Sequence, residues 1–453
     1  MLGNQDCICA LATPQGLGAI GVIRVSGPNS IRQLAGLFSK SLEGKQSHTL
    51  HFGHWRTSGG ALIDEVLVSI FAEGKSYTGE ESLEISCHGS AYIQEQILRS
   101  LLENGCRLAN PGEFTQRAFL NGKLDLSQAE AVADLIASQT QRAHEIALNQ
   151  LRGKLSNELR DLREKLIHFA SLVELELDFA EEDVEFADRD ELKALVNDVL
   201  VYVGRLIQSF ALGNAIRNGV PVAIVGAPNT GKSTLLNQLL GEDRAIVSDI
   251  AGTTRDVIEE MLNIDGISFR LIDTAGIREG AETIEAMGIE RSRAKIEQAA
   301  IVLCMCDASN PDSLAEVKAW VKELRSRHPS KTVFLLANKV DLVAGTKPSD
   351  EMLFISAREG FGIDELRTKL SSAVKGDFNL ADETIVSNAR HHDALIRTAE
   401  SLSKAKSGLE EGVTGDFVAM DIRQAMFYLG SITGDISTDD LLGNIFAKFC
   451  IGK

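Results

Sequence analysis

Gly226-Ala-Pro-Asn-Thr-Gly231-Lys232-Ser233 is the stretch that decides the fold of one domain. The apolar run 222–225 precedes it and the leucine-rich segment 234–240 follows it, which predicts a buried strand, a loop and a helix. Glycines let backbone N–H groups surround an anion, and the N-terminus of the following helix favours negative charge. Lys232 is then expected to reach the terminal phosphates of a nucleotide and Ser233 to bind Mg²⁺.

Three later motifs predict that this nucleotide is GTP. Asp273-Thr-Ala-Gly276 follows the apolar segment 269–272, where the carboxylate can hold Mg²⁺ through water. Asn338-Lys-Val-Asp341 ends in a carboxylate that can accept hydrogens from guanine N1 and N2, a pair that adenine does not offer. Ser356-Ala-Arg358 would close over the base. The order and spacing predict a Ras-like α/β P-loop GTPase domain.

The residues assigned to GTP binding lie in these motifs and in the switch loop, which is the segment between the P-loop and Asp273 that contains residues 248–254. They are Asn229, Thr230, Gly231, Lys232, Ser233, Thr234, Ser248, Thr253, Thr254, Asp273, Thr274, Ala275, Gly276, Asn338, Lys339, Asp341, Ser356, Ala357 and Arg358.

The chemistry of hydrolysis is less conventional in this sequence. Ile277 stands where many GTPases of this fold carry a water-orienting Gln, so another group must position the attacking water. Arg278 and the carboxylates that follow, Glu285 among them, are candidates; Lys232 and Arg278 are the candidate catalytic cations. Asn229 either binds a monovalent cation with the switch loop 248–253 or only stabilises the turn, and both interpretations stay open.

The overall composition is that of a multidomain globular protein. The chain has 453 residues, and its formal net charge of −18 disfavours a broad RNA-binding surface. No run of eighteen apolar residues occurs and the N-terminus lacks signal-peptide features, so we expect a cytoplasmic protein without a membrane segment. The seven cysteines do not have the spacing of a zinc site or a disulfide framework.

Proline distribution separates helical from mixed regions. Residues 112–220 and 349–453 contain no proline, which predicts helices. Leu151, Leu155, Leu159, Leu162 and Leu166 predict one long amphipathic helix. The acidic segment 178–191 is expected to be a loop or a helix start. Further helices are expected at 390–409 and 417–429, and a last one from 437–440 to 449.

This pattern predicts an α+β N-terminal domain and an all-α helical domain with the GTPase inserted into it. Short apolar runs at 7–12, 19–25, 66–71 and 83–87, with a helix at 91–102, characterise the first domain. The predicted domains are residues 1–120, residues 121–215 with 380–453, and the GTPase at 216–379.

Several motifs together resemble the MnmE (TrmE) family of tRNA-modification GTPases, within the TrmE-Era-EngA-YihA-Septin-like GTPases. They are the P-loop, Gly252-Thr-Thr-Arg-Asp256, Tyr77-Thr-Gly-Glu80, Pro111-Gly-Glu-Phe114, 117–125 and the terminal Phe449-Cys-Ile-Gly-Lys453. The resemblance spans the whole chain. It implies a homodimer that acts with the FAD-containing partner MnmG to place an aminomethyl or carboxymethylaminomethyl group on C5 of the tRNA wobble uridine.

The resemblance also implies ligands for particular residues. Potassium ligands fall on Asn229, Ser248, Ile250 and Thr253, Mg²⁺ ligands on Ser233 and Thr254 with Asp273 through water, and the water-orienting carboxylate on Glu285. A tetrahydrofolate derivative of the 5,10-methylene or 5-formyl type falls on Arg24, Glu84, Lys123 and Lys453.

The residues themselves leave alternatives open at these sites. Arg24 could equally be an edge-strand arginine. Cys450 is a candidate reactive thiol, but it could also be a small apolar residue at a helix end. For the whole chain, the rival functions are a GTP-dependent RNA-binding or ribosome-assembly switch and a purely mechanical GTPase.

Overall fold

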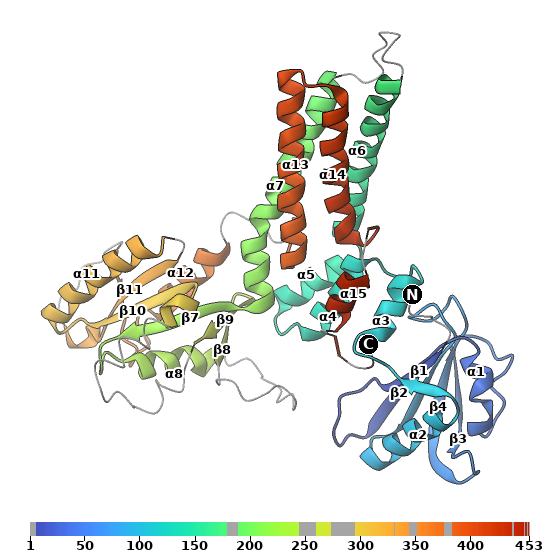
Figure 1. Cartoon of the computed structure of the whole chain (residues 1–453). Coiled ribbons are helices and arrows are strands. Elements are labelled where there is room, and N and C mark those ends of the chain that lie inside the picture. The colour runs from blue at the N-terminus through green and yellow to red at the C-terminus, as the bar shows by residue number, and fades with distance from the viewer. Residues whose placement is uncertain are drawn as a thin grey trace. The chain divides into compact units, whose positions relative to one another are not determined.

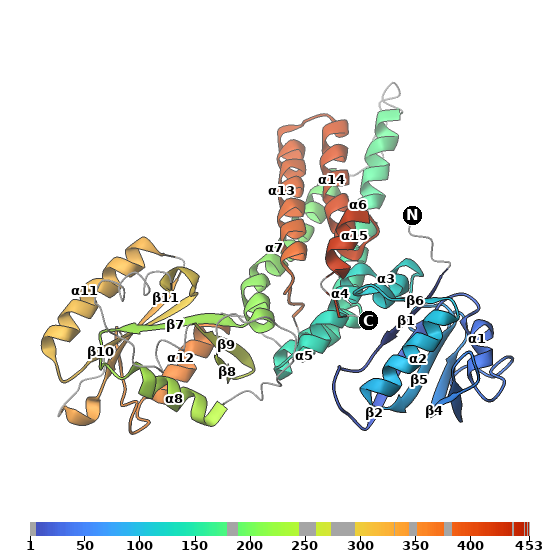
Figure 2. The ribbon, with the colours of Figure 1, turned by 60° about the horizontal axis from the view of Figure 1, so that its bottom comes forward.

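The computed structural model describes residues 6–178, 189–243, 260–272, 295–329, 331–343, 351–375, 383–436, 439–447, 449–450 and 452. The chain divides into two compact units (Figures 1 and 2). One comprises Met1–Ile136, Asn149–Phe186 and Ile422–Lys453, and the other comprises Ala137–Leu148 and Ala187–Asp421. Because these units do not isolate a helical domain, the three predicted domain ranges remain a proposal.

The first unit contains a mixed six-stranded sheet built from the N-terminal residues. Neighbouring strands are antiparallel except β1 and β6, which are parallel. In spatial order the strands are β3 (Thr49–Arg56), β4 (Leu62–Phe71), β5 (Ser82–His88), β2 (Ile20–Ser26), β1 (Cys7–Leu11) and β6 (Cys106–Leu108). The predicted strands are therefore confirmed, whereas β3 and β6 were not foreseen. Arg24 lies on the interior strand β2, so its interpretation as an edge-strand residue was wrong.

Helices cover one face of this sheet. The short helices α1 (Ser30–Gln33) and η1 (Ala35–Leu37) and the long helix α2 (Ala91–Glu103) supply this cover. Trp55 is fully buried in the core between them, and its indole N–H donates to Ser100 Oγ at 3.0 Å. This bond satisfies the polar atom of the largest core side chain.

The opposite face of the sheet is only partly covered. Phe114 of α3 (Glu113–Leu120) packs on Ile8 and Ala10 of β1. On β3 and β4, by contrast, Leu50 and Phe52 are more than half exposed and Leu67, the cross-strand partner of Phe52, is 39% exposed. These three side chains form what we call the open apolar face.

The helices of the first unit correct two predictions. The predicted long helix is confirmed for Leu155 to Leu166, which lie on α6 (Lys154–Asp178), but Leu151 ends the preceding helix α5 (Gln141–Leu151), and Gly153 between them adopts φ 81°. A positive φ interrupts a right-handed helix and glycine adopts it without steric cost, which explains the break. The last helix, α15 (Asp439–Phe446), ends three residues earlier than expected. It packs on α4 (Leu126–Ala137) through Phe446 and Leu442.

A second six-stranded sheet forms the centre of the other unit. All its strands are parallel except β8, which is antiparallel at one edge. Helix α11 (Pro311–Arg327) covers one face, and α8 (Lys232–Asp243) and α12 (Ile363–Lys375) cover the other. The spatial order is β12 (Leu353–Phe354), β11 (Thr332–Asn338), β10 (Ile301–Asp307), β7 (Val220–Gly226), β9 (Ile267–Leu271) and β8 (Glu260–Ile264). This is the doubly covered α/β sheet predicted from the P-loop.

Long helices complete the second unit. Helix α7 (Arg189–Asn218) packs along α13 (Ala389–Glu411), and α14 (Gly415–Thr433) follows after a short turn, with its residues from Ile422 onward belonging to the first unit. The two predicted helices at 390–409 and 417–429 are thus confirmed. Among the described residues, α7 alone is long and apolar enough to cross a membrane, but a helix packed in a protein core passes the same test. Its Val196, Val199 and Val203 are fully buried.

Candidate nucleotide site and N-terminal site

The phosphate-binding loop lies between β7 and α8, as predicted. Thr230 Oγ1 donates to the carbonyl of Ala227 at 2.8 Å, which closes the loop on itself. Lys232 Nζ donates to the carbonyls of Gly226 and Ala227, both at 2.9 Å. Asn229 is exposed and left-handed, with φ 63°. The loop carbonyls therefore hold the ammonium group of Lys232 near the N-terminus of α8, where phosphates bind favourably.

Asn338 connects the phosphate loop with the two base-recognition motifs. Its Nδ2 donates to the carbonyl of Thr230 at 2.8 Å, and its Oδ1 accepts from the N–H of Ala357 at 2.9 Å. The side chain is almost fully buried at 3% exposure. Gly231 makes this link possible, because a Cβ there would lie 2.2 Å from Asn338 Nδ2.

Asp341 lies in the position expected for guanine recognition. It belongs to the short helix η3 (Val340–Leu342), and Ser356 Oγ donates to its Oδ1 at 2.6 Å. The residue is exposed, so the carboxylate can still accept hydrogens from a base. Arg358 extends into solvent and lies 3.7 Å from Glu359. The structure thus brings the P-loop, Asn338, Asp341 and 356–358 together at the carboxyl ends of the strands.

Arg24 and Glu84 form the centre of a second polar site on the N-terminal sheet. They are direct cross-strand partners, and Arg24 Nε and Nη2 donate to Glu84 Oε1 at 3.0 and 2.8 Å. The Arg24 guanidinium also lies 5.4 Å from the ring centre of Tyr77 and 5.8 Å from that of Phe114. Glu84 Oε2 makes none of the hydrogen bonds found among the described residues, so it can accept from a ligand.

The other residues predicted for this site are placed only in part. Lys123 Nζ donates to the carbonyl of Gly74 at 3.0 Å, on the loop that carries Tyr77. Lys453 lies outside the described residues. Its neighbour Gly452 packs so closely on β1 that a Cβ would lie 2.4 Å from the carbonyl of Leu11. Gly452 thereby lies against the same sheet as Arg24.

Comparison with known proteins covers nearly the whole chain. Residues 126–450 match the model of the MnmE helical domain, and residues 7–123 match that of the GTP-binding protein TrmE N-terminus. Proteins described as tRNA modification GTPase MnmE from Flavobacterium johnsoniae and Bacteroides fragilis are each 51% identical to the chain, over 465 and 468 residues. Each alignment covers 99% of this chain and 100% of the relative.

The chain belongs to the MnmE family of tRNA modification GTPases. Its fold class follows: a TrmE N-terminal α+β domain, a helical domain and a P-loop GTPase domain. A solved structure of Aquifex aeolicus Era bound to GDP·AlF4⁻ is 30% identical over 40% of the chain, but its TM-score of 0.25 is too low to carry an inference.

Part of the MnmE-type site lies outside the described residues. This holds for the predicted Mg²⁺ partners Thr254 and Asp273, the potassium ligands Ser248, Ile250 and Thr253, and the catalytic candidates Arg278 and Glu285. It also holds for Thr274, Ala275 and Gly276. Of the Mg²⁺ ligands the structure describes Ser233, at the first turn of α8, where a hydroxyl fits a magnesium ion bound to nucleotide phosphates. No cluster of metal-binding side chains occurs elsewhere in the described part of the chain.

Sequence reasoning missed a buried ionic network in the TrmE-type domain. Arg117, 2% exposed, donates to Glu113 at 3.0 Å, to Asp6 at 2.7 Å and to Glu80 at 3.2 Å. Burial raises the pKa of Glu113, but hydrogen bonds from Arg107, the Asn110 N–H and Arg117 outweigh it and hold the pKa below its usual range. The segment 111–117 contains Glu113 and Arg117, but the other partners of Arg117, Asp6 and Glu80, are distant in sequence, so the segment alone does not predict the network.

Cys450 is accessible at the end of the MnmE-type C-terminal segment. All seven cysteines fall in the described part of the chain, and Cys450 alone is exposed. Its carbonyl accepts a hydrogen bond of 3.4 Å from the N–H of Gly112. Because α15 ends at Phe446, Cys450 does not lie at a helix end, and the reactive thiol remains a prediction: no base contacts Cys450 among the described residues.

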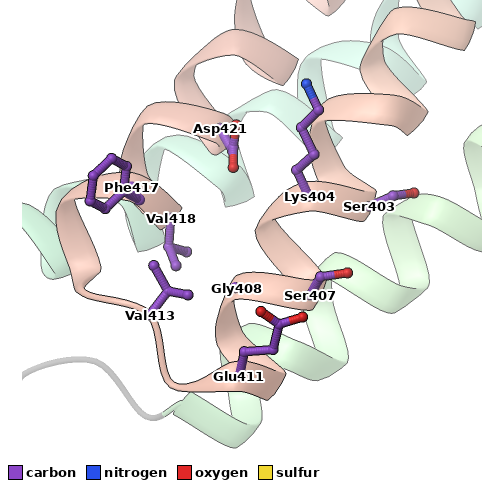
Figure 3. Close-up of a pocket in the computed structure, with 9 residues that line it drawn as sticks. All are labelled: Ser403, Lys404, Ser407, Gly408, Glu411, Val413, Phe417, Val418 and Asp421. Carbon is purple, nitrogen blue, oxygen red and sulfur yellow. The ribbon is translucent and has the colours of Figure 1, made fainter.

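A separate pocket of about 460 Å³ lies between α13 and α14. Figure 3 shows Lys404 and Glu411 of α13 and Asp421 and Phe417 of α14 at its wall. None of the predicted site residues lines it, so the nucleotide site is not this cavity.

Proposed function

We propose that this protein hydrolyses GTP to drive the modification of wobble uridine at C5 in tRNA, together with an FAD-containing partner of the MnmG type. The observation that carries the proposal is the linkage by Asn338 of the phosphate loop and the 356–358 motif in a chain that matches MnmE along its whole length. This geometry supports GTP binding by the P-loop and guanine discrimination by Asp341.

The hydrolysis mechanism that we propose uses two cations. Mg²⁺ would be held by Ser233 and Thr254, with Asp273 acting through water, and would neutralise charge on the phosphates. Potassium would lie at Asn229 with Ser248, Ile250 and Thr253 and stabilise charge between the β- and γ-phosphates. Lys232 would bind the terminal phosphates, Glu285 would orient the attacking water, and Arg278 is a further candidate cation.

The cation role is tested by GTP turnover in K⁺ and in Na⁺. We expect turnover in K⁺ to be much faster, and we expect Asn229→Gly to abolish that difference. Glycine retains the left-handed turn at φ 63° while the side-chain oxygen is lost. If Asn229 only stabilises the turn, the variant will keep the ratio of the two rates. Equal rates for the wild-type protein in both salts would overturn the potassium proposal.

The second part of the proposal is binding of a reduced folate at Arg24, Glu84, Lys123 and Lys453. The contacts support it: Glu84 Oε2 can accept from the amino and N–H edge of a pterin, and lysines suit a glutamyl tail. Titration with 5-formyltetrahydrofolate should show binding that Arg24→Ala abolishes. Arg32→Ala is the matched control, because Arg32 is an exposed arginine of α1 on the same domain.

The function as a whole is tested by nucleoside analysis of tRNA. Cells that lack this protein should lose C5-aminomethyl-type uridines. A plasmid with the wild-type chain should restore them, whereas Asp273→Ala should not. An unchanged nucleoside profile would favour the rival RNA-binding or ribosome-assembly switch.

We further propose that the protein is a homodimer in the cytoplasm. The open apolar face of Leu50, Phe52 and Leu67 supports self-association, because contiguous exposed apolar side chains on a sheet are costly to leave in water. A cytoplasmic location agrees with tRNA as the substrate.

A further inference from the structure

Asp307 occupies a central position at the edge of the GTPase sheet where nucleotides bind. It is the last residue of β10, between the phosphate-loop strand β7 and the base-recognition strand β11. Met305 pairs with Gly226 of β7, and Asp307 itself pairs with Asn338 of β11. Its carboxylate therefore lies between the two halves of the site described above, although none of the nucleotide motifs includes it.

Both oxygens of this carboxylate are engaged. Oδ2 accepts from Lys339 Nζ at 2.6 Å, while Oδ1 accepts from the N–H and the hydroxyl of Ser309 at 2.9 and 2.6 Å. The backbone is held as well, since the N–H of Ala308 donates to the carbonyl of Asn338 at 2.8 Å. These hydrogen bonds fix the orientation of the Asp307 carboxylate independently of its ion pair with Lys339.

Lys339 is a residue that benefits from such a restraint. It lies between Asn338 and Asp341 in the guanine-recognition motif, and its φ of 67° is in the left-handed region that non-glycine residues rarely adopt. Its side chain has many rotamers, which a nucleotide would otherwise have to restrict on binding. The ion pair restricts them in advance and also neutralises a carboxylate that would repel phosphate.

We propose that Asp307 is a positioning residue for guanine-nucleotide binding that acts by holding Lys339. This inference rests on the GTP-binding role of the pocket and adds a residue outside its motifs. Asp307 does not take part in the chemical step. It lowers the cost of binding, so its loss should affect nucleotide affinity and KM more than kcat.

The test compares Asp307→Asn and Asp307→Ala in the full-length protein by release of a fluorescent GDP analogue and by steady-state GTP hydrolysis. A charge-assisted hydrogen bond at a partly exposed site leads us to expect roughly tenfold faster release and higher KM for Asp307→Ala, with kcat changed less than about twofold. Asp307→Asn should fall between, because an amide oxygen still accepts from Lys339. Asp312→Asn is the control, because it removes a carboxylate from the first turn of α11, and Asp312 makes no hydrogen bond or ion pair with Lys339.

A double-mutant cycle separates positioning from a general structural effect. In a Lys339→Ala background, Asp307→Ala should add less than about twofold to the release rate, because the two residues act as one unit. An undiminished effect in that background would overturn the proposal, and so would unchanged release in the single variants. Absence of GTP binding by the wild-type protein would instead contradict the nucleotide assignment itself.

Discussion

At the scale of single residues, Gly231 shows how strictly the nucleotide pocket constrains side-chain size. Its φ is 96°, and an added Cβ would lie 2.2 Å from the buried amide of Asn338. Gly231→Ala should therefore separate the phosphate loop from the base-recognition loops and weaken GTP binding at least a hundredfold, about 3 kcal/mol. Nucleotide titration checks this. Gly241→Ala is the control, because Gly241 is an exposed helical residue of α8 with no atom within 4 Å of its added Cβ; if both variants bind GTP alike, the steric argument is wrong.

Individual residues also show which parts of the proposed site could be predicted from the sequence. The P-loop, Asn338, Asp341 and Ser356 could be assigned because each belongs to a contiguous motif whose chemistry is local. The pairing of Asp307 with Lys339 could not, since it depends on the register of β10 against β11. The same applies to Arg117, whose acidic partners Asp6 and Glu80 are far from it in the sequence.

At the scale of elements, the attachment of the C-terminal segment depends on the turn before α3. Gly112 adopts φ 69°, and a Cβ there would lie 2.7 Å from the carbonyl of Phe446 and 3.0 Å from Phe449 Cβ. Gly112→Ala should displace this segment and increase the rate at which Cys450 reacts with a thiol reagent by roughly tenfold. Gly122→Ala provides the control: its φ of 68° imposes the same backbone strain, but no atom lies within 4 Å of its Cβ. Equal labelling rates of Cys450 in the two variants would contradict the prediction that close packing at Gly112 holds the C-terminal segment in place.

The ionic network that joins Asp6, the loop that carries Glu80, β6 and α3 predicts acid sensitivity. Burial raises the pKa values of Asp6 and Glu113, but hydrogen bonds from Arg107 and Arg117 leave both below their ordinary values of 3.8 and 4.5. These carboxylates bind fewer protons when folded than when unfolded, so their stabilisation is present above the ordinary values and is lost as the pH falls through the lower folded ones.

Removing the buried cation should expose this dependence. Arg117→Met removes the arginine partner of the largely buried Glu80 and one of the two arginines that bind Glu113, at a cost of about 3–5 kcal/mol. The pH at which circular dichroism reports acid unfolding should rise as a result. Arg99→Met, which removes only an exposed helical pair with Glu103, should leave it unchanged. A similar midpoint for both variants would mean that the network does not stabilise the fold.

Elements also show what local pattern cannot predict. Short apolar runs located β1, β2, β4 and β5, but the polar His51 and His54 interrupt such a run in β3, which was therefore not predicted. The leucine periodicity continued across Gly153, so one helix was predicted where the backbone forms two. The helix break is a backbone conformation at Gly153, and β3 is defined by its pairing with β4. Neither feature follows from the spacing of apolar side chains.

At the scale of the whole molecule, the open apolar face predicts self-association through the N-terminal sheet. Phe52→Asp would place a charge on that face and should shift the protein from dimer to monomer in analytical ultracentrifugation. Phe427→Asp is the control, because Phe427 is similarly exposed, at 46%, on α14. A wild-type protein that sediments as a monomer at micromolar concentration would refute the prediction.

The chain contains two tryptophans, and each compact unit holds one of them. Trp55 is buried in the N-terminal sheet with its indole bonded to Ser100, whereas Trp320 is partly exposed on α11 of the GTPase sheet. Their emission should therefore differ in wavelength, and a single Trp→Phe change leaves one tryptophan in the whole protein, in the unit chosen for observation. Unfolding of the two halves can then be followed independently in the intact protein, without an added label.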